Sequence, residues 1–307
     1  MNVLLCLPTG HLAAWRAAFA RALPEASIAV WPEAAGRADY VVAWNPPPEL
    51  FVDQPAPRAI FNLGAGVDAL LATPTLPAAV PIYRLEDAGM AEQMAEYAAW
   101  VVLGAYREFG TYAAQQRAAD WVPRRRQDKA AFGVGLLGCG VLGRAVASAL
   151  QPFGFPLACY SRGHKVVAGV ESYAGKTELG VFLARSRVLV CLLPATPATR
   201  DFVDAALIAQ LPRGAHVVNL ARGDVVVDAD LVAALDRGHL AHATLDVFRT
   251  EPLLPAHPFW HHPQVTVTPH VSALTRIAGS TAQIATRIRR LEQGLPVGGA
   301  VDRARGY

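Results

Sequence analysis

The amino-acid sequence predicts an α/β protein with two domains, each built around a parallel β-sheet. The chain has 307 residues, which is too many for one compact core. Hydrophobic residues make up 53% of it and charged residues 17%, a balance typical of globular proteins. Short apolar runs alternate with helical stretches in two series, and such alternation places helices on the faces of parallel sheets.

The first series of elements occupies the first third of the chain. Residues 11–23 are expected to form the helix between the first two strands. Residues 90–119 are rich in Ala, Glu and Gln and contain no proline, which predicts one or two helices. The apolar runs expected to form strands are residues 3–7, 28–31, 40–44 and 59–63.

The second series begins near residue 132. Residues 144–150 and 230–236 are expected to be helical, and residues 273–291 form a last helix that leads away from the second sheet. The expected strands are residues 132–137, 157–160, 188–193, 216–220, 242–246 and 265–268.

The last helix determines the expected domain organisation. If it packs back on the first domain, that domain is discontinuous and contains residues 1–98 plus 276–307. Residues 99–275 then form the second domain. We therefore expect two Rossmann-like/flavodoxin-like parallel-sheet domains with an active-site cleft between them.

Charge and cysteine content exclude several classes of protein. The net charge of +3 is small for this length, so neither nucleic acid nor a membrane is an expected partner. The apolar opening lacks a basic start, and Pro8 ends it well short of the roughly 18 residues of a membrane span. No pair of the four cysteines has metal-ligand spacing, so we expect reduced thiols, no metal and a cytoplasmic protein. The basic run at residues 124–126 is either a solvated linker or a phosphate contact.

A glycine-rich turn predicts dinucleotide binding. Gly138, Gly140 and Gly143 form G-x-G-x-x-G, with an apolar strand before it and a helix after it. The first glycine permits the tight turn, the second lets the backbone approach a pyrophosphate, and the third lets helix and strand pack closely. The N–H groups of Val141 and Leu142 would face the phosphates at the helix start. A tight turn that binds nothing is the alternative.

The end of the next strand favours NADP(H) over NAD(H). An NAD site usually has Asp or Glu there, bound to the ribose 2′-hydroxyl, but this chain has Ser161 and Arg162, with Lys165 close behind. A carboxylate would repel a 2′-phosphate, whereas a guanidinium can bind it with two hydrogen bonds. Alternatively, Arg162 is a solvated loop residue.

Three polar side chains at or beyond later strand ends form a candidate catalytic set. Arg222, Glu251 and His270 could separately be a surface cation, a turn residue and a helix cap. Together, behind a cofactor turn, they suit ketone reduction. His270 would donate the proton, Glu251 would favour the charged imidazole and orient it, and Arg222 would clamp a substrate carboxylate. This set predicts a 2-oxo acid as substrate.

The first domain offers a weaker candidate site. Gly64 and Gly66 flank a turn at a strand end, so backbone N–H groups around Ala65 could receive the substrate carboxylate. Trp44 also ends a strand and could line the pocket. The alternatives are that the turn is a plain strand-to-helix connection and that Trp44 is a core aromatic.

Further motifs lie along nearly the whole chain, at residues 63–68, 83–90, 138–143, 192–197, 219–223, 245–248, 268–271 and 301–307. With these motifs the chain resembles the D-isomer-specific 2-hydroxyacid dehydrogenase family, and most of all its glyoxylate/hydroxypyruvate reductase A-like branch. The resemblance implies that Arg222, Glu251 and His270 are the substrate-binding arginine, the acid partner and the proton donor.

The resemblance also implies the cofactor, the substrate and the assembly. It implies an NADPH-using reductase of glyoxylate, hydroxypyruvate or a near relative that forms the (R)-2-hydroxy acid. It implies a homodimer built on the nucleotide domain and residues 90–119. A bulkier 2-oxo acid, or a non-catalytic NAD(P)-binding sensor, remains an alternative. The further residues expected to bind cofactor are Leu193, Pro194, Leu220, Ala221, Asp246, His270 and Ser272.

Overall fold

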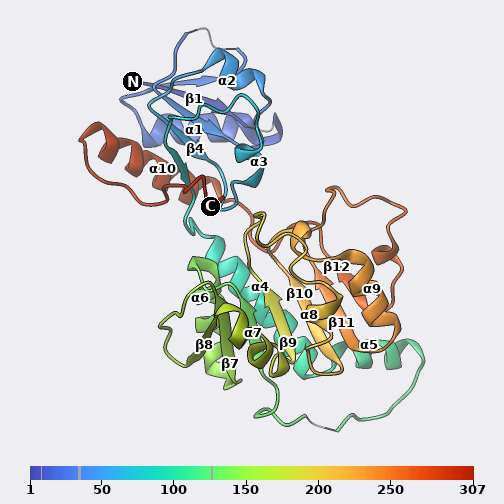
Figure 1. Cartoon of the computed structure of the whole chain (residues 1–307). Helices are drawn as coiled ribbons and strands as arrows, with labels where there is room; N and C mark the ends of the chain where they lie inside the picture. Colours follow the sequence, from blue (N-terminus) through green and yellow to red (C-terminus); the bar gives the residue numbers. More distant parts are fainter. Residues whose placement is uncertain (8, 34–35, 126) are drawn as a thin grey trace. The chain divides into compact units, whose positions relative to one another are not determined.

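A computed structural model describes residues 1–7, 9–33, 36–125 and 127–307 of the chain. Pro8 and Arg126, which two sequence predictions include, lie outside these residues. The chain divides into two compact units, Met1–Met90 with Thr275–Tyr307, and Ala91–Leu274 (Figure 1). Each unit contains one parallel sheet, of five and seven strands respectively. The predicted α/β class with two parallel sheets is therefore confirmed.

The sheet of the first unit has the strand order β2-β1-β3-β4-β5, which is the flavodoxin-like order. Every residue of β3 and β4 is buried, because these apolar segments are covered on both faces. The strands are β1 (Asn2–Cys6), β2 (Ser27–Val30), β3 (Tyr40–Ala43), β4 (Ala59–Asn62) and β5 (Ile82–Arg84). The helices are η1 (Thr9–His11), α1 (Leu12–Ala22), α2 (Glu49–Asp53), α3 (Asp68–Leu71) and α10 (Ile277–Glu292).

The C-terminal helix belongs to this first unit. Ile284 and Ile288 of α10 are fully buried, and the helix packs against α1. The Arg287 guanidinium donates a hydrogen bond to the backbone carbonyl of Arg84 at 2.5 Å and pairs with Glu86 at 2.8 Å. These contacts tie the last helix to the edge strand β5.

The boundary between the units lies after Met90 and not after residue 98. The reason is the packing of α4 (Met90–Tyr106), whose residues Met94, Ala98, Val101 and Val102 are buried in the core of the second unit. The stretch predicted as one or two helices contains two, because α4 is followed by α5 (Phe109–Arg117).

The sheet of the second unit has the order β12-β11-β10-β9-β6-β7-β8, the doubly wound Rossmann order with one strand added. Its strands are β6 (Val134–Leu137), β7 (Leu157–Ser161), β8 (Val170–Ala174), β9 (Val188–Cys191), β10 (Ala215–Asn219), β11 (Leu240–Leu245) and β12 (Val265–Val267). Its remaining helices are α6 (Val141–Leu150), η2 (Gln151–Phe153), α7 (Gly175–Ala184), α8 (Ala205–Ile208), η3 (Gly223–Val225), α9 (Asp228–Asp236) and η4 (Pro258–Trp260).

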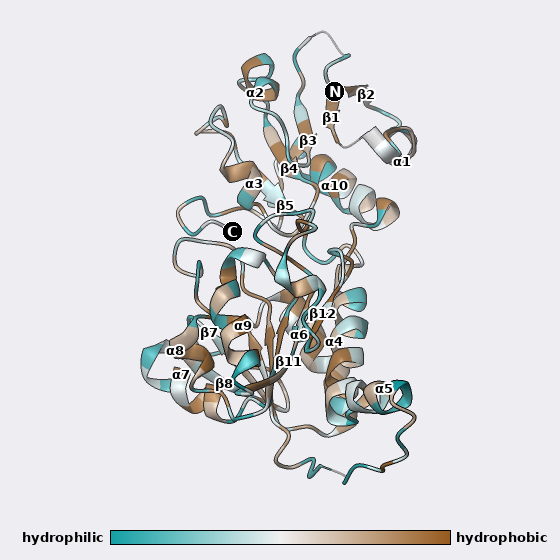
Figure 2. Ribbon diagram, turned by 90° about the vertical axis from the view of Figure 1, so that its right-hand side faces the viewer, coloured by the Kyte–Doolittle hydropathy of each residue, from teal (hydrophilic) through white to brown (hydrophobic). Residues whose placement is uncertain are grey.

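Apolar clusters on the two faces of this sheet form the core of the second unit. One cluster joins the sheet to α4 and α6, and the other joins it to α7, α8 and α9. Figure 2 shows hydrophobic strands in this unit and helices that carry both hydrophobic and hydrophilic residues. All neighbouring strands are parallel, so their carboxyl ends share one edge of the sheet. That edge is where open α/β sheets bind ligands.

Two further predictions concern the whole chain. All four cysteines are buried and free, which agrees with reduced core thiols. Across the described residues, no helix is long and apolar enough to cross a membrane.

Candidate active site

The glycine turn has the geometry of a pyrophosphate cradle. Gly138 has φ +107°, and a Cβ there would lie 2.8 Å from the Leu192 carbonyl oxygen. A Cβ on Gly143 would lie 2.3 Å from the Gly138 carbonyl oxygen, so strand and helix require glycine at both positions. A Cβ on Gly140 would meet nothing within 4 Å. The turn is therefore closed on the protein side and open where a ligand would approach.

The helix start beside this turn suits an anion. Gly140 is the N-cap of α6 and supplies no side-chain acceptor for the first N–H groups of the helix. Val141 is 45% exposed, and Leu142 is partly exposed. Leu193 and Pro194, just beyond the end of neighbouring β9, are also partly exposed. These residues fit a dinucleotide, whose phosphates would accept hydrogen bonds from the free helix end.

The end of β7 carries no carboxylate. Ser161 is its last residue, and the Ser161 hydroxyl donates a hydrogen bond to the Gly163 carbonyl at 2.8 Å. Arg162 and Lys165 are exposed on the loop that follows. This strand end therefore presents cations where an NAD site usually presents an acid.

His270 and Glu251 form an ion-pair geometry beyond β12 and β11. The Nδ1 atom of His270 lies 2.7 Å from Oε2 of Glu251, and the two side chains are 41% and 36% exposed. The other oxygen of Glu251 accepts a hydrogen bond from the Phe248 N–H at 2.9 Å. Because Glu251 occupies Nδ1, the Nε2 atom of the same ring is the one that can reach a substrate.

The charge state of Glu251 follows from its surroundings. Partial burial raises the pKa of the Glu251 carboxyl. Hydrogen bonds from His270 and the Phe248 N–H, together with the charges of His270 and Arg222, outweigh burial and bring the pKa below its ordinary value. Glu251 is thus a carboxylate at neutral pH and can stabilise a charged imidazole.

Arg222 stands beside this pair, just beyond β10. Its backbone is extended, and its carbonyl accepts a hydrogen bond from Nδ2 of Asn219 at 2.9 Å. Its guanidinium donates to the Ala221 carbonyl at 2.7 Å. The structure therefore brings all three residues of the predicted catalytic set to one edge of the second sheet.

Asp246 has a role that the sequence did not indicate. Its predicted contact with cofactor stays a prediction, and the residue is fully buried. Its Oδ1 accepts hydrogen bonds from the Thr268 hydroxyl and the Val271 N–H, and its Oδ2 accepts one from the Ser272 N–H. These bonds hold the loop in which His270 has φ +54°, a left-handed conformation that is uncommon outside glycine.

Two other predicted cofactor contacts are also buried. Leu220 is 3% exposed and packs in the core with α4 and α6, and Ser272 is 2% exposed. As for Asp246, their contact with cofactor stays a prediction. Ala221 is partly exposed and remains at the surface of the same edge.

The first unit contains the second predicted site. Asn62 donates hydrogen bonds from Nδ2 to the carbonyls of Gly64 at 3.0 Å and Gly66 at 2.8 Å, which shapes the turn. The Trp44 ring lies so close to Gly64 that a Cβ there would be 2.1 Å from it. Among the described residues, no acceptor bonds the N–H groups of Ala65 or Gly66. The turn thus has a tryptophan on one side and two available donors.

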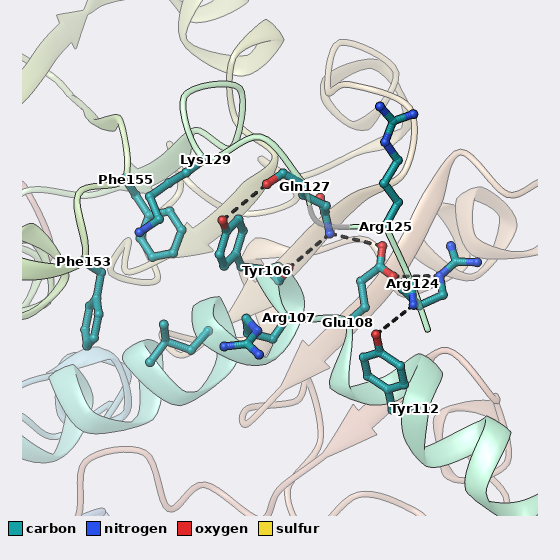
Figure 3. Close-up of a pocket in the computed structure, with 11 residues that line it drawn as sticks. Tyr106, Arg107, Glu108, Tyr112, Arg124, Arg125, Gln127, Lys129, Phe153 and Phe155 are labelled. Atoms are coloured by element: carbon teal, nitrogen blue, oxygen red, sulfur yellow. Dashed lines mark hydrogen bonds and ion pairs between the residues drawn. The ribbon is translucent and has the colours of Figure 1, made fainter. Parts of the chain in front are cut away.

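The basic run lies away from this edge of the second unit. Its described residues Arg124 and Arg125 line a cavity of about 440 Å³, together with Arg107, Lys129, Phe153 and Phe155 (Figure 3). Phe155 precedes β7, so this cavity is at the amino-terminal edge of the sheet, opposite the glycine turn. Arg124 pairs with Glu108 at 2.8 Å and its side chain is half exposed, which fits the linker reading. No group of three His, Cys, Asp or Glu within the described part of the chain could hold a metal ion.

A dinucleotide cradle and an acid–base pair on one edge of a doubly wound sheet define an NAD(P)-dependent oxidoreductase. Residues 99–272 match the model of the family described as D-isomer specific 2-hydroxyacid dehydrogenase, NAD binding domain. The chain belongs to the D-isomer-specific 2-hydroxyacid dehydrogenase family and binds an NAD(P) cofactor.

Three solved structures resemble the chain over its full length. A D-isomer specific 2-hydroxyacid dehydrogenase from Xanthobacter autotrophicus, in complex with NADPH and MES, is 38% identical with a TM-score of 0.93. An NADPH-dependent glyoxylate/hydroxypyruvate reductase from Sinorhizobium meliloti, with NADP and sulfate, is 36% identical with a TM-score of 0.94. A Rhizobium etli protein in complex with NADP, HEPES and L(+)-tartaric acid is 30% identical with a TM-score of 0.91. Each match covers 100% of this chain and 99% of the other.

Proposed function

We propose that this protein reduces a small 2-oxo acid, such as glyoxylate or hydroxypyruvate, to the (R)-2-hydroxy acid with NADPH as reductant. The observation that carries the proposal is the 2.7 Å contact of His270 with an ionised Glu251 beside Arg222, on the edge that bears the glycine turn. The reductase activity of the Sinorhizobium relative and the NADP(H) in all three relatives support the same reading.

The side chains divide the chemistry between them. The nicotinamide, when bound, supplies the hydride that adds to the carbonyl carbon. Arg222 holds the carboxylate of the oxo acid with parallel hydrogen bonds and draws electron density toward the carbonyl oxygen. The Nε2–H of His270 donates the proton to that oxygen, and Glu251 stabilises the imidazolium until the transfer.

A substrate panel tests the proposal directly. NADPH absorbance at constant protein is followed after addition of glyoxylate, hydroxypyruvate, pyruvate or phenylpyruvate. Rapid NADPH oxidation is expected with the first two. A faster reaction with phenylpyruvate would favour a bulkier substrate, and no oxidation with any acid would overturn the assignment as a reductase.

Replacement of Arg222 with alanine is expected to raise the KM for the oxo acid by about a hundredfold, because two charge-assisted hydrogen bonds to the carboxylate are lost. The NADPH dissociation constant should stay within about twofold of the wild-type value. Steady-state kinetics with glyoxylate and fluorescence titration of NADPH measure the two effects. An unchanged KM would contradict the clamp role.

We propose that Arg162 and Lys165 select NADPH by binding its 2′-phosphate. The Arg162→Ala variant should bind NADPH about tenfold more weakly, a loss of about 1.4 kcal/mol, and NADH almost unchanged. Fluorescence titration with both cofactors gives the ratio. Equal losses of affinity for the two cofactors would contradict a contact between Arg162 and the 2′-phosphate.

The turn at residues 64–66 of the first unit, with Trp44 beside it, favours a small substrate. We propose that the N–H groups of Ala65 and Gly66 bind the oxo-acid carboxylate, and that Trp44 limits the side chain accepted there. The Trp44 ring lies against Gly64, so a bulky substituent placed beside this turn would meet the ring.

We also propose that the protein is a homodimer formed through α5 and the segment after it. This region exposes large apolar side chains, with Trp121 96%, Phe109 55% and Val122 50% exposed. A second copy is the partner that would bury them. Sedimentation equilibrium measures the mass, and a monomer at micromolar concentration would exclude the dimer.

A further inference from the structure

Glu251 lies on a short turn, residues 247–252, that we name the Glu251 turn. Its side chain can meet His270 only if this turn is held in place, because Glu251 is bound to its own turn through the Phe248 N–H. Arg249, two residues before Glu251, is not explained by the acid–base chemistry. Its side chain is only 30% exposed and points back into the protein.

Arg249 connects the Glu251 turn to the segment that carries Arg222. Its Nε donates a hydrogen bond to the Val226 carbonyl at 3.1 Å, and its Nη2 donates to the same carbonyl. Nη2 also pairs with the carboxylate of Asp201, and Oδ1 of Asp228 lies 4.0 Å from Nε. Oδ2 of Asp228 in turn lies 3.5 Å from Nε2 of His257. One guanidinium thus joins three chain segments.

The Glu251 turn also contacts residues 222–226, which we name the Arg222 turn, through the backbone. A Cβ on Gly223, directly after Arg222, would lie 1.9 Å from the carbonyl carbon of Phe248 and 2.2 Å from the nitrogen of Arg249. The peptide between Phe248 and Arg249 therefore lies flat on Gly223. The Val226 carbonyl that Arg249 binds belongs to the same turn, since the Val226 N–H donates to the Gly223 carbonyl at 3.1 Å.

We propose that Arg249 is a positioning residue that ties the Glu251 turn to the Arg222 turn, and so holds Glu251 against His270. The inference rests on the proposed roles of Glu251 and His270, and adds a residue that touches neither substrate nor cofactor. Two side chains that act on one substrate must keep a fixed separation, and a shared guanidinium anchor provides it.

The test compares Arg249→Met with Arg185→Met in the full chain. Arg185 is a matched control, because it is also 30% exposed, pairs with Glu171 and donates to the Tyr173 hydroxyl at 2.7 Å, on the opposite edge strand. Arg249→Met is expected to lower kcat for glyoxylate between about tenfold and a hundredfold, with the KM for NADPH unchanged.

Hydrogen exchange of the free protein gives a readout that needs no activity. Exchange over residues 247–252, and at the Phe248 N–H above all, should be faster in Arg249→Met and unchanged in Arg185→Met. Arg249→Lys, which keeps the charge but cannot make both contacts, should be intermediate. If Arg249→Met does not fold, Asp201→Asn, which removes the counter-ion of Arg249, should change exchange in the same direction.

The outcomes separate the two proposals. A wild-type protein without reductase activity overturns the proposed function, while the exchange data still test the anchor. Unchanged exchange over residues 247–252, or faster exchange with an unchanged kcat, overturns the positioning role.

Discussion

The His270→Ala variant is expected to reduce glyoxylate about 10² to 10⁴ times more slowly than the wild-type protein, because the developing alkoxide loses its positioned proton donor. Water is the only replacement, and it is a weaker acid without a fixed orientation. NADPH should still bind, since the glycine turn and the end of β7 do not depend on the imidazole. Stopped-flow measurement of NADPH oxidation and fluorescence titration of NADPH separate the two effects.

Two variants serve as controls for this result. His261→Ala removes an exposed histidine of the same unit and should leave kcat unchanged. Glu251→Gln keeps His270 but replaces the carboxylate that lies 2.7 Å from Nδ1, so kcat should fall by less than in His270→Ala. Near-normal turnover in His270→Ala would exclude this residue as the acid.

The second large effect concerns stability at low pH. His216 on β10 is 9% exposed, and its Nε2 lies 2.9 Å from the Thr244 hydroxyl. Burial, and then the neighbouring His242, lower the pKa of His216 from 6.5 to about 3. Below pH 6.5 the unfolded chain therefore binds a proton that the folded chain does not. The free energy of unfolding should fall by about 1.4 kcal/mol per pH unit as the pH drops from 6.5 toward 3, on the order of 5 kcal/mol in all.

Urea unfolding at pH 7.5 and pH 5 measures this contribution. From pH 7.5 to pH 5, the free energy of unfolding of the wild-type protein should fall by about 2 kcal/mol more than that of His216→Gln, whose side chain cannot take up a proton. His164→Gln, which replaces a histidine whose side chain is 62% exposed, should behave as the wild type. The same pH dependence in His216→Gln and wild type would show that His216 does not couple folding to pH.

Most strands and long helices could be predicted from local sequence. Apolar runs such as Val188–Cys191 are fully buried central strands, and their composition alone indicates this. The strands β5 and β8 were missed because they lie at sheet edges, where β5 is short and β8 is only partly buried. Hydrophobic periodicity is weak when a strand has only one protected side.

The three candidate catalytic residues were chosen from the sequence, but the contacts that support them were not predicted. Arg222, Glu251 and His270 follow three strands whose carboxyl ends must share an edge in a parallel sheet, so their proximity follows from the fold class. The buried position of Asp246 and the anchoring by Arg249 depend on how loops 20 or more residues apart fold over one another. No local pattern records such contacts.

The sequence by itself determined the two parallel sheets, the glycine turn and the choice of candidate reacting side chains, because periodicity, glycine spacing and strand-end positions are local properties of the chain. Only the tertiary structure decided which polar residues near the edge of the sheet are exposed and which are buried. Asp246 and Glu251 are both acids close to the end of β11, yet one is fully buried by hydrogen bonds from the His270 loop and the other remains 36% exposed in side-chain area. That difference arises from long-range packing, which sets burial and hence the role of each carboxylate.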